Sequence, residues 1–131
     1  GIIEFSNHCR LSCNYCGIRS RNRGVQRYRM TPEEIVEYAF RARLYGYPTV
    51  VLQSGEDTWY TSDIICRILR DIKADGPMAI TLSCGERPAD EYRQFAAAGC
   101  DRGDEHRSVA ELGDFERNAA LPDDGELLQL E

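Results

Sequence analysis

The sequence predicts an α/β fold made of three consecutive βα units that share a parallel sheet. Three runs rich in apolar or β-branched residues, at 1–6, 49–53 and 78–83, each precede a segment with helical spacing. Strands separated by single helices form right-handed βαβ units with parallel strands. A chain of 131 residues can form one modest domain, but it is too short for a complete barrel of about 250 residues. One domain, or part of one, is therefore expected.

The first unit begins with a strand over residues 1–6, followed by a loop that reaches Met30. A helix then starts behind Thr31, a suitable N-cap, with Pro32 in the first helical position and Glu34 placed to close a capping box. Apolar residues at helical spacing continue until Gly46 ends the helix, and they are Ile35, Tyr38, Ala39 and Ala42.

The next two units repeat this order. Residues 49–53 are the continuous β-branched run expected of a parallel strand that is buried on both faces. A helix follows over about 62–76, and after the strand at 78–83 a third helix spans about 89–98 and ends at Gly99. The buried stripe of the second helix is expected to be Ile64, Ile65, Ile68, Leu69 and Ile72. From Gly103 onward the sequence is acidic and contains no fourth buried strand. Only residues 108–115 and 125–130 are weakly helical there, and we expect this tail to be poorly ordered.

Charge is unevenly distributed along a chain of net charge −6. The first thirty residues carry six arginines against one acid, whereas residues 101–131 carry ten acids against three arginines. The basic stretch lacks interleaved aromatic residues apart from Tyr28, so nucleic-acid binding is not expected. No signal peptide opens the sequence, and no apolar run approaches the roughly 20 residues that span a bilayer. We therefore expect a cytoplasmic protein without a membrane partner.

Three of the six cysteines, Cys9, Cys13 and Cys16, follow the first predicted strand with the spacing C-x3-C-x2-C. Clustered cysteines without a secretory signal usually bind metal or take part in catalysis. Thiolates are the standard ligands of iron–sulfur clusters, and three of them on a 4Fe-4S cluster leave one iron open. A small molecule with an amine and a carboxylate, such as S-adenosylmethionine, can chelate that iron, accept an electron and break its sulfur–carbon bond to give a 5'-deoxyadenosyl radical.

Two other interpretations of the cysteines stay open. A zinc site usually takes four ligands as paired short spacings, and His8 lies beside Cys9, where it cannot easily complete a tetrahedron with it. The thiols could also be structural groups. That is how we interpret the unclustered Cys66, Cys84 and Cys100, as small buried hydrophobes.

Polar loops follow all three predicted strands, namely the cysteine loop and residues 54–57 and 83–86. Because the chemistry of parallel α/β barrels lies at the carboxyl ends of the strands, these loops are expected to converge. Glu56 is expected to accept hydrogen bonds from a cationic amine, and Gly55 to let backbone approach the ligand closely. A Gly-Glu pair after a strand is, taken alone, more often an ordinary turn.

These motifs resemble the hallmarks of the radical S-adenosylmethionine superfamily. Its C-x3-C-x-aromatic-C motif is met with Tyr15 as the aromatic residue, and its Gly-Gly-Glu motif is altered here to Ser54-Gly55-Glu56. Within the superfamily the sequence most resembles the HydE group of FeFe-hydrogenase maturases, over about residues 2–102. Biotin synthase and methylornithine synthase are similar in the same segments. The stretches that carry the resemblance are IEFSN (3–7), YCG (15–17), RYRMTPEEI (27–35), VLQSGED (51–57), TLS (81–83) and GE (85–86).

The resemblance implies a partial (βα)6 barrel of the TIM-like kind in which Cys9, Cys13 and Cys16 ligate the 4Fe-4S cluster. It places Tyr15 near the adenine of S-adenosylmethionine and leaves Glu86 as a candidate substrate contact. The remaining contacts that it implies for S-adenosylmethionine are Gln53, Ser54, Gly55, Glu56, Thr81 and Ser83.

The implied activity is reductive cleavage of S-adenosylmethionine to a radical that acts on a cysteine-bound iron carbonyl-cyanide precursor of the hydrogenase H-cluster. The alternatives are a substrate of the biotin synthase or methylornithine synthase kind, a non-catalytic 4Fe-4S binding fragment, and a remnant without function of its own.

The resemblance ends near Arg102. HydE-like chains continue with a strand that carries an Arg-His-Glu-Thr motif and with further βα units, whereas here Arg102 runs into an acidic sequence. We therefore divide the chain into a truncated radical SAM core, residues 1–102, and a non-matching tail, residues 103–131. A fragment, an assembly error or a shifted reading frame would each give this pattern. Half a barrel leaves a strand edge unpaired and one side of the pocket missing, which argues against activity of the chain alone.

The expected partners are a small-molecule or iron-complex substrate, other hydrogenase maturases and a low-potential electron donor. The arginine-rich residues 19–29 have two interpretations. As with most charge runs, a solvated loop is favoured. Alternatively, the arginines offset the negative charge of a cluster and dock an acidic donor such as flavodoxin or ferredoxin.

Overall fold

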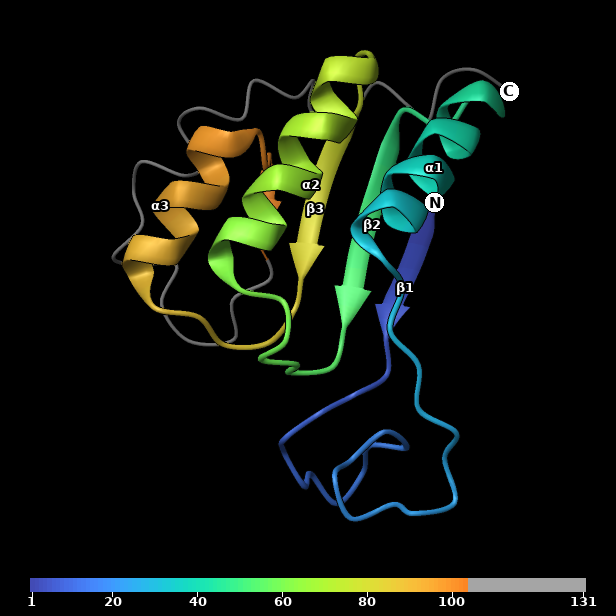
Figure 1. The fold of residues 1–131 in the computed structure, drawn as a ribbon, viewed down its shortest axis with the longest axis vertical. Helices are drawn as coiled ribbons and strands as arrows, with labels where there is room; N and C mark the ends of the chain where they lie inside the picture. Colours follow the sequence, from blue (N-terminus) through green and yellow to red (C-terminus); the bar gives the residue numbers. More distant parts are fainter. Residues whose placement is uncertain (104–131) are drawn as a thin grey trace, which may run out of the picture.

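The protein forms a parallel sheet whose strands lie side by side in the order in which they follow along the chain. The computed structural model describes residues 1–103, and it contains β1 (Ile2–Ser6), β2 (Thr49–Ser54), β3 (Ala79–Ser83) and β4 (Arg102–Gly103) in the order β1-β2-β3-β4 (Figure 1). The connecting helices are α1 (Pro32–Leu44), α2 (Ser62–Asp75) and α3 (Ala89–Ala98). The predicted α/β fold of consecutive βα units is confirmed.

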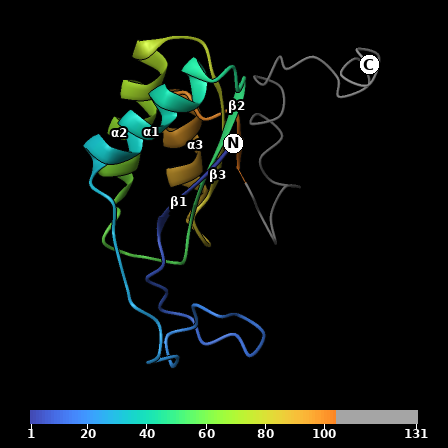
Figure 2. The same ribbon diagram turned by 90° about the vertical axis from the view of Figure 1, so that its right-hand side faces the viewer.

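All three helices cover the same face of the sheet (Figure 2). Strand residues that face the helices are buried, such as Val50 and Leu52, whereas Thr49, Val51 and Gln53 on the other face of β2 remain partly exposed. The expectation that residues 49–53 are buried on both faces is therefore wrong for the described part of the chain, because the helices lie on one side. The rest of the core consists of Ile3, Phe5, Ile35, Ala39, Tyr60, Ile65, Cys66, Ile68, Leu69, Ile72, Met78, Ile80, Leu82, Cys84, Tyr92, Phe95, Ala98 and Cys100.

Local signals set the ends of α1. The Thr31 hydroxyl accepts a hydrogen bond from the Glu34 N–H (3.2 Å), and the Glu34 carboxylate accepts one from the Thr31 N–H (2.7 Å), so the predicted capping box is present. The helix ends at Leu44, just before Gly46, whose φ is 87°. Tyr38 was expected on the buried face of α1, but it is 52% exposed.

The later helices also begin and end close to where the sequence predicts. Thr61 caps α2 by accepting a hydrogen bond from the Ile64 N–H, and Gly99, with φ of 115°, ends α3. Cys66, Cys84 and Cys100 are buried, as expected of small apolar residues. Burial raises the pKa of the Cys84 thiol to about 11 and that of Cys100 to about 12.

A fourth strand of two residues, neither of them buried, follows α3. Arg102 and Gly103 pair with Thr81 and Leu82 of β3. The preceding residue, Asp101, fixes this pairing because its carboxylate accepts hydrogen bonds from the Ile80 N–H (2.8 Å) and from Lys73 Nζ (2.7 Å). The segments predicted to be weakly helical, 108–115 and 125–130, lie outside the described residues. No helix within residues 1–103 has both the length and the apolar character required to cross a bilayer.

Candidate metal centre at the cysteine loop

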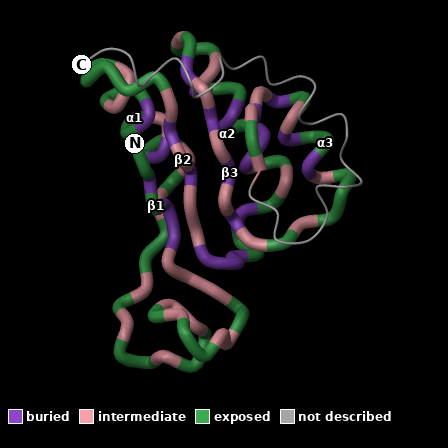
Figure 3. Tube along the Cα trace, turned by 180° about the vertical axis from the view of Figure 1, so that it is seen from behind, coloured by how far each residue is buried: buried purple, intermediate pink, exposed green. Residues whose placement is uncertain are grey.

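The cysteine loop, which we define as residues 7–28, extends beyond the carboxyl ends of the strands (Figure 1). A connection of this length without a helix or strand of its own is uncommon in a compact domain and is usually functional. Cys9, Cys13 and Cys16 lie on it as free, partly buried thiols. Every residue of the loop is exposed or partly exposed, whereas buried residues alternate along the strands beside it (Figure 3).

Hydrogen bonds within the cysteine loop fold its central part back on itself. The Cys16 N–H donates to the Cys13 carbonyl (3.2 Å), so these two cysteines flank a tight turn. The Ser20 N–H donates to the carbonyl of Leu11 (2.7 Å), which brings together the segments on either side of that turn. Cys13 and Cys16 are therefore presented on a closed hairpin-like segment rather than on an extended chain.

The loop that follows β2 contacts the cysteine loop directly. The Glu56 N–H donates to Cys9 Sγ (3.4 Å), and the Arg10 N–H donates to the Glu56 carbonyl (3.1 Å). Gly55 makes this approach possible, since a Cβ there would collide with the His8 carbonyl and lie 2.8 Å from Cys9 Cβ. Gly55 was expected to admit a ligand, and the group that approaches it in this structure is the cysteine loop itself.

Glu56 joins the loops that follow β1, β2 and β3. Its carboxylate is 7% exposed, and it accepts hydrogen bonds from Arg10 Nε (2.5 Å) and from the Glu86 N–H (2.9 Å). The predicted convergence of the three loops is thus present. Glu56 and Glu86 line a cavity of about 350 Å³ together with Arg10 and Arg87. Because two donors already engage the carboxylate, a cationic amine has to replace Arg10 or share Glu56 with it.

Other predicted contact residues lie on the face of the sheet that the helices leave uncovered. Gln53 of β2 is the register partner of Ser83 of β3, and Thr81 lies two residues earlier on the same strand. Gln53, Ser54 and Gly55 line a small cavity of about 70 Å³, to which Ile18 of the cysteine loop also contributes. Glu56 lines the other cavity, whereas Thr81 and Ser83 line neither of the two.

Tyr15 stands apart from both cavities. Its side chain is 93% exposed, between Cys13 and Cys16 on the outer part of the cysteine loop. In this structure the predicted adenine contact therefore projects into solvent.

An ion pair between the buried Asp57 and the partly exposed Arg29, at the base of the cysteine loop, was missed by sequence reasoning. Arg29 donates to both carboxylate oxygens of Asp57, at 2.7 and 3.0 Å, and the Ser6 hydroxyl donates to the same group at 2.7 Å. Burial alone would raise the pKa of Asp57, but the hydrogen bonds from Arg29, Ser6 and the Trp59 N–H outweigh it, so the pKa lies below its usual range. The sequence did contain one indication of this pair, because Asp57 follows Glu56 directly in a loop after a predicted strand.

The arginine-rich stretch is only partly a solvated surface. Arg19 donates to the Cys16 carbonyl (2.9 Å), Arg29 pairs with Asp57, and Arg27 donates to carbonyls of the cysteine loop. Arg19 and Arg27 are partly buried and held by the loop, so for these two the interpretation as a solvated loop is wrong, whereas Arg29 pairs with Asp57 and stays 38% exposed. Arg21 and Arg23 are exposed, as that interpretation expects.

Three thiols on one loop form a donor set that a 4Fe-4S cluster can accept. Within residues 1–103, no three His, Cys, Asp or Glu side chains converge closely enough to hold one metal ion. A 4Fe-4S cluster offers separate iron atoms, so its three thiolates need not meet at one point. The Ser12 hydroxyl, between Cys9 and Cys13 in sequence, is buried and lacks a hydrogen-bond partner in the part of the chain that the structure describes. A buried orphan of this kind fits a bound group beside it that residues 1–103 do not supply.

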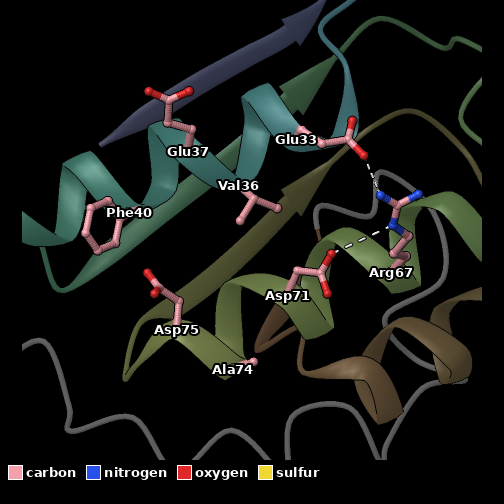
Figure 4. A pocket seen from close by; sticks show the side chains of 8 residues that line it. All are labelled: Glu33, Val36, Glu37, Phe40, Arg67, Asp71, Ala74 and Asp75. Atoms are coloured by element: carbon pink, nitrogen blue, oxygen red, sulfur yellow. Dashed lines mark hydrogen bonds and ion pairs between the residues drawn. The ribbon is translucent and has the colours of Figure 1, made fainter.

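A larger groove lies away from this region, between α1 and α2 (Figure 4). It has a volume of about 640 Å³, with Val36, Phe40 and Ala74 in its lining. Each of its four carboxylates is paired with an arginine. Glu33 and Asp71 contact Arg67, while Glu37 contacts Arg41 and Asp75 contacts Arg43. The groove therefore offers no free charged group, and the candidate site remains at the cysteine loop.

Comparisons with known proteins identify the family of the chain. The family described as the Radical SAM superfamily matches residues 3–102. The [FeFe] hydrogenase maturase subunit HydE of Thermotoga maritima is 54% identical over 101 residues, which cover 77% of this chain and 29% of that protein. Biotin synthase of Magnetococcus marinus is 28% identical over 110 residues, covering 81% and 34% of the two chains.

A solved structure shows the same arrangement of strands and helices. The crystal structure of methylornithine synthase superposes with a TM-score of 0.72 at 27% sequence identity, over 78% of this chain and 31% of that one. The chain thus spans about a third of the length of these relatives, as expected of part of a TIM-like barrel. The family match covers nearly all of the described residues, and we conclude that the chain belongs to the radical SAM superfamily.

Proposed function

We propose that this chain is the cluster-binding part of a radical SAM enzyme, in which Cys9, Cys13 and Cys16 ligate a 4Fe-4S cluster with one open iron. The observation that carries the proposal is that three free thiols share one loop at the carboxyl ends of parallel strands. The chemistry supplied by such a bound cluster is the transfer of one electron, taken from a low-potential donor, into the sulfonium of S-adenosylmethionine, which splits into methionine and a 5'-deoxyadenosyl radical.

The protein's own part is to hold the cofactor beside the thiols. We assign the polar groups of S-adenosylmethionine to residues on the uncovered face of the sheet or at the strand end next to the cysteine loop. These residues are Gln53, Ser54, Gly55, Thr81 and Ser83. Tyr15 is assigned to the adenine, which requires its exposed ring to turn inward from solvent.

We assign to Glu56 the binding of the amine of S-adenosylmethionine, and to Glu86 a contact with the substrate. The Arg10 side chain that now pairs with Glu56 is 62% exposed, so it can turn into solvent and leave the carboxylate to an incoming cation. Because Glu56 itself is buried, its carboxylate has to stay paired, and the incoming amine would take over the role of Arg10 while the Glu86 N–H keeps its hydrogen bond.

For the whole enzyme we propose a role like that of HydE, in which the radical acts on a cysteine-bound iron carbonyl-cyanide precursor in the cytoplasm, with other hydrogenase maturases as partners. The support is the 54% identity to a HydE maturase. A second candidate is a biotin synthase-like or methylornithine synthase-like reaction on a small molecule, supported by the similarity to those enzymes. A non-catalytic 4Fe-4S binding fragment is the third. The proposed electron donor is a flavodoxin or a ferredoxin.

The proposal is tested by anaerobic reconstitution with iron and sulfide, followed by electron paramagnetic resonance of the dithionite-reduced chain. We expect a 4Fe-4S signal that changes when S-adenosylmethionine is added. Cys13→Ser should abolish the signal, whereas Cys66→Ser, which alters a buried thiol in α2, should keep it. A cluster that does not respond to S-adenosylmethionine would support the non-catalytic fragment, and the absence of any cluster would refute the proposal.

A further inference from the structure

The guanidinium of Arg27 holds together parts of the cysteine loop that are far apart in sequence. Nη1 donates to the carbonyls of Asn7 (2.5 Å) and Ile18 (2.7 Å), and Nη2 donates to those of Arg19 (2.8 Å) and Asn22 (3.1 Å). Asn7 precedes the first cysteine by two residues, and Ile18 follows the last by two. One side chain therefore joins the chain just before Cys9 to the chain just after Cys16.

The neighbouring contacts close the same base. The Asn7 side chain accepts a hydrogen bond from the Tyr28 N–H (2.7 Å) and donates one to the Gln26 carbonyl (2.8 Å). The Asn7 side chain thus fixes the backbone on both sides of Arg27, at Gln26 and at Tyr28. The position of Arg27 is set by the fold of the loop, unlike that of an arginine held only by a surface carboxylate.

Only an arginine can make this set of bonds. The planar guanidinium directs its donors as a rigid fork, whereas the lysine ammonium is a compact charge with three donors on a flexible stem. Four carbonyl acceptors also carry no net charge. The contact therefore depends on geometry rather than on the pairing of opposite charges.

We infer that Arg27 is the positioning residue of the cysteine loop, which closes the loop independently of bound metal and so keeps Cys9, Cys13 and Cys16 on one closed segment. The inference rests on the proposed function in that these thiols are taken as the cluster ligands. It goes further because it assigns the closed state of the loop to one residue. A loop that is already closed lowers the entropy cost of binding the cluster, because the chain does not have to be ordered in that step.

The test compares Arg27→Gln and Arg27→Lys with Arg23→Gln in the full chain. Arg23 is exposed in the same loop, so its substitution removes the same charge without touching the four carbonyls. The first measurement is amide hydrogen exchange of the metal-free proteins, because the amides of Cys16, Arg19, Ser20 and Asn22 are hydrogen-bonded inside the loop. The second is the iron bound after reconstitution, together with the electron paramagnetic resonance spectrum.

We expect both Arg27 variants to exchange these loop amides at least tenfold faster than the unmodified chain, with no change in the strands β2 and β3. We also expect them to bind less than half as much iron, with a broadened signal, while Arg23→Gln behaves as the unmodified chain. Full recovery of loop protection in Arg27→Lys would overturn the inference, because it would show that the charge suffices. Equal behaviour of Arg27→Gln and Arg23→Gln would overturn it as well.

The two proposals fail in different ways. If the unmodified chain binds no cluster, the proposed function fails, yet hydrogen exchange in the metal-free proteins still decides whether Arg27 closes the loop. If the unmodified chain binds a cluster and exchange is unaffected in Arg27→Gln, only the inference about Arg27 fails.

Discussion

The backbone N–H of Glu56 lies 3.4 Å from Cys9 Sγ and donates a hydrogen bond to it. This contact places the first cysteine against the end of β2, so the position of its sulfur depends on the sheet as well as on the cysteine loop. Hydrogen bonds to ligand sulfurs are among the factors that set the reduction potentials of iron–sulfur clusters. The protein thus controls one of the three thiols through a rigid element.

Gly55→Ala should disturb this contact. The added Cβ would meet the backbone at His8 and the side chain of Cys9, neither of which can move without shifting the end of β1. We expect a loss of about 1–3 kcal/mol in the free energy of unfolding, measured in urea, and a lower iron content after reconstitution. Gly17→Ala is the matched control, because a Cβ there would meet nothing within 4 Å. Equal effects of the two substitutions would contradict this account.

Asp57→Asn should weaken the base of the cysteine loop in a pH-dependent way. The folded-state pKa of Asp57 lies below its unfolded value, so the carboxylate stabilises the fold above pH of about 4 and loses this effect as the pH falls through the folded-state pKa. At pH 7 we expect the variant to be less stable by about 1–3 kcal/mol, since one partner of a mostly buried pair is removed.

Urea unfolding at several pH values measures this difference between Asp57→Asn and the unmodified chain. The difference should shrink as the pH falls from 5 towards 2. Asp71→Asn is the control, because Asp71 is 52% exposed and lies 3.8 Å from Arg67, and its effect should stay within about 0.5 kcal/mol. A difference for Asp57→Asn that stays constant down to pH 2 would show that its charge is not the cause.

Ser12→Ala should have opposite consequences with and without a cluster. Within residues 1–103 the hydroxyl is buried without a hydrogen-bond partner, so its removal should leave the thermal unfolding temperature of the metal-free chain unchanged or raise it. In the reconstituted chain we expect a more negative reduction potential, because a hydroxyl that donates to a cluster sulfur stabilises the reduced, more negative state. Ser20→Ala on the exposed side of the same loop serves as the control. A lower unfolding temperature of metal-free Ser12→Ala would mean that the hydroxyl already has a partner.

The six thiols should separate into two classes on alkylation. Cys9, Cys13 and Cys16 are partly exposed, whereas Cys66, Cys84 and Cys100 are buried, and burial raises the pKa of each of the latter three thiols. Since the thiolate is the reactive form, iodoacetamide at pH 8 should modify only the three loop cysteines of the folded, metal-free chain. Peptide mass analysis identifies the modified sites, and the same reaction in urea should label all six. Rapid labelling of Cys84 in the folded chain would contradict its burial.

Features that depend on neighbouring residues were predictable from sequence. The capping box of Thr31 and Glu34 involves one turn of chain, and it occurs in the structure as expected. The convergence of three loops followed from the direction of parallel strands, and the contacts among Cys9, Glu56 and Glu86 agree with it. Both follow from rules that need no knowledge of distant packing.

Features that depend on contacts between residues far apart in sequence were not predictable. Six arginines lie within the first thirty residues, and their identity alone does not show that Arg27 meets four carbonyls while Arg23 stays in solvent. The partial exposure of Val51 was also missed, because a β-branched run has the same sequence whether one or both faces of its strand are covered. Asp57 was overlooked since its partner Arg29 approaches from the far end of the cysteine loop.

The coverage of a single face of the sheet has a consequence for the synthesis of the protein. Each described strand pairs with the strand that comes next along the chain, and each helix packs on a core that its own neighbours supply. This unit can therefore form as it leaves the ribosome, before any later part of a longer polypeptide has been translated. Its uncovered face then meets water with Gln53 and Ser83 in one row and with Ile2 and Val51 in another.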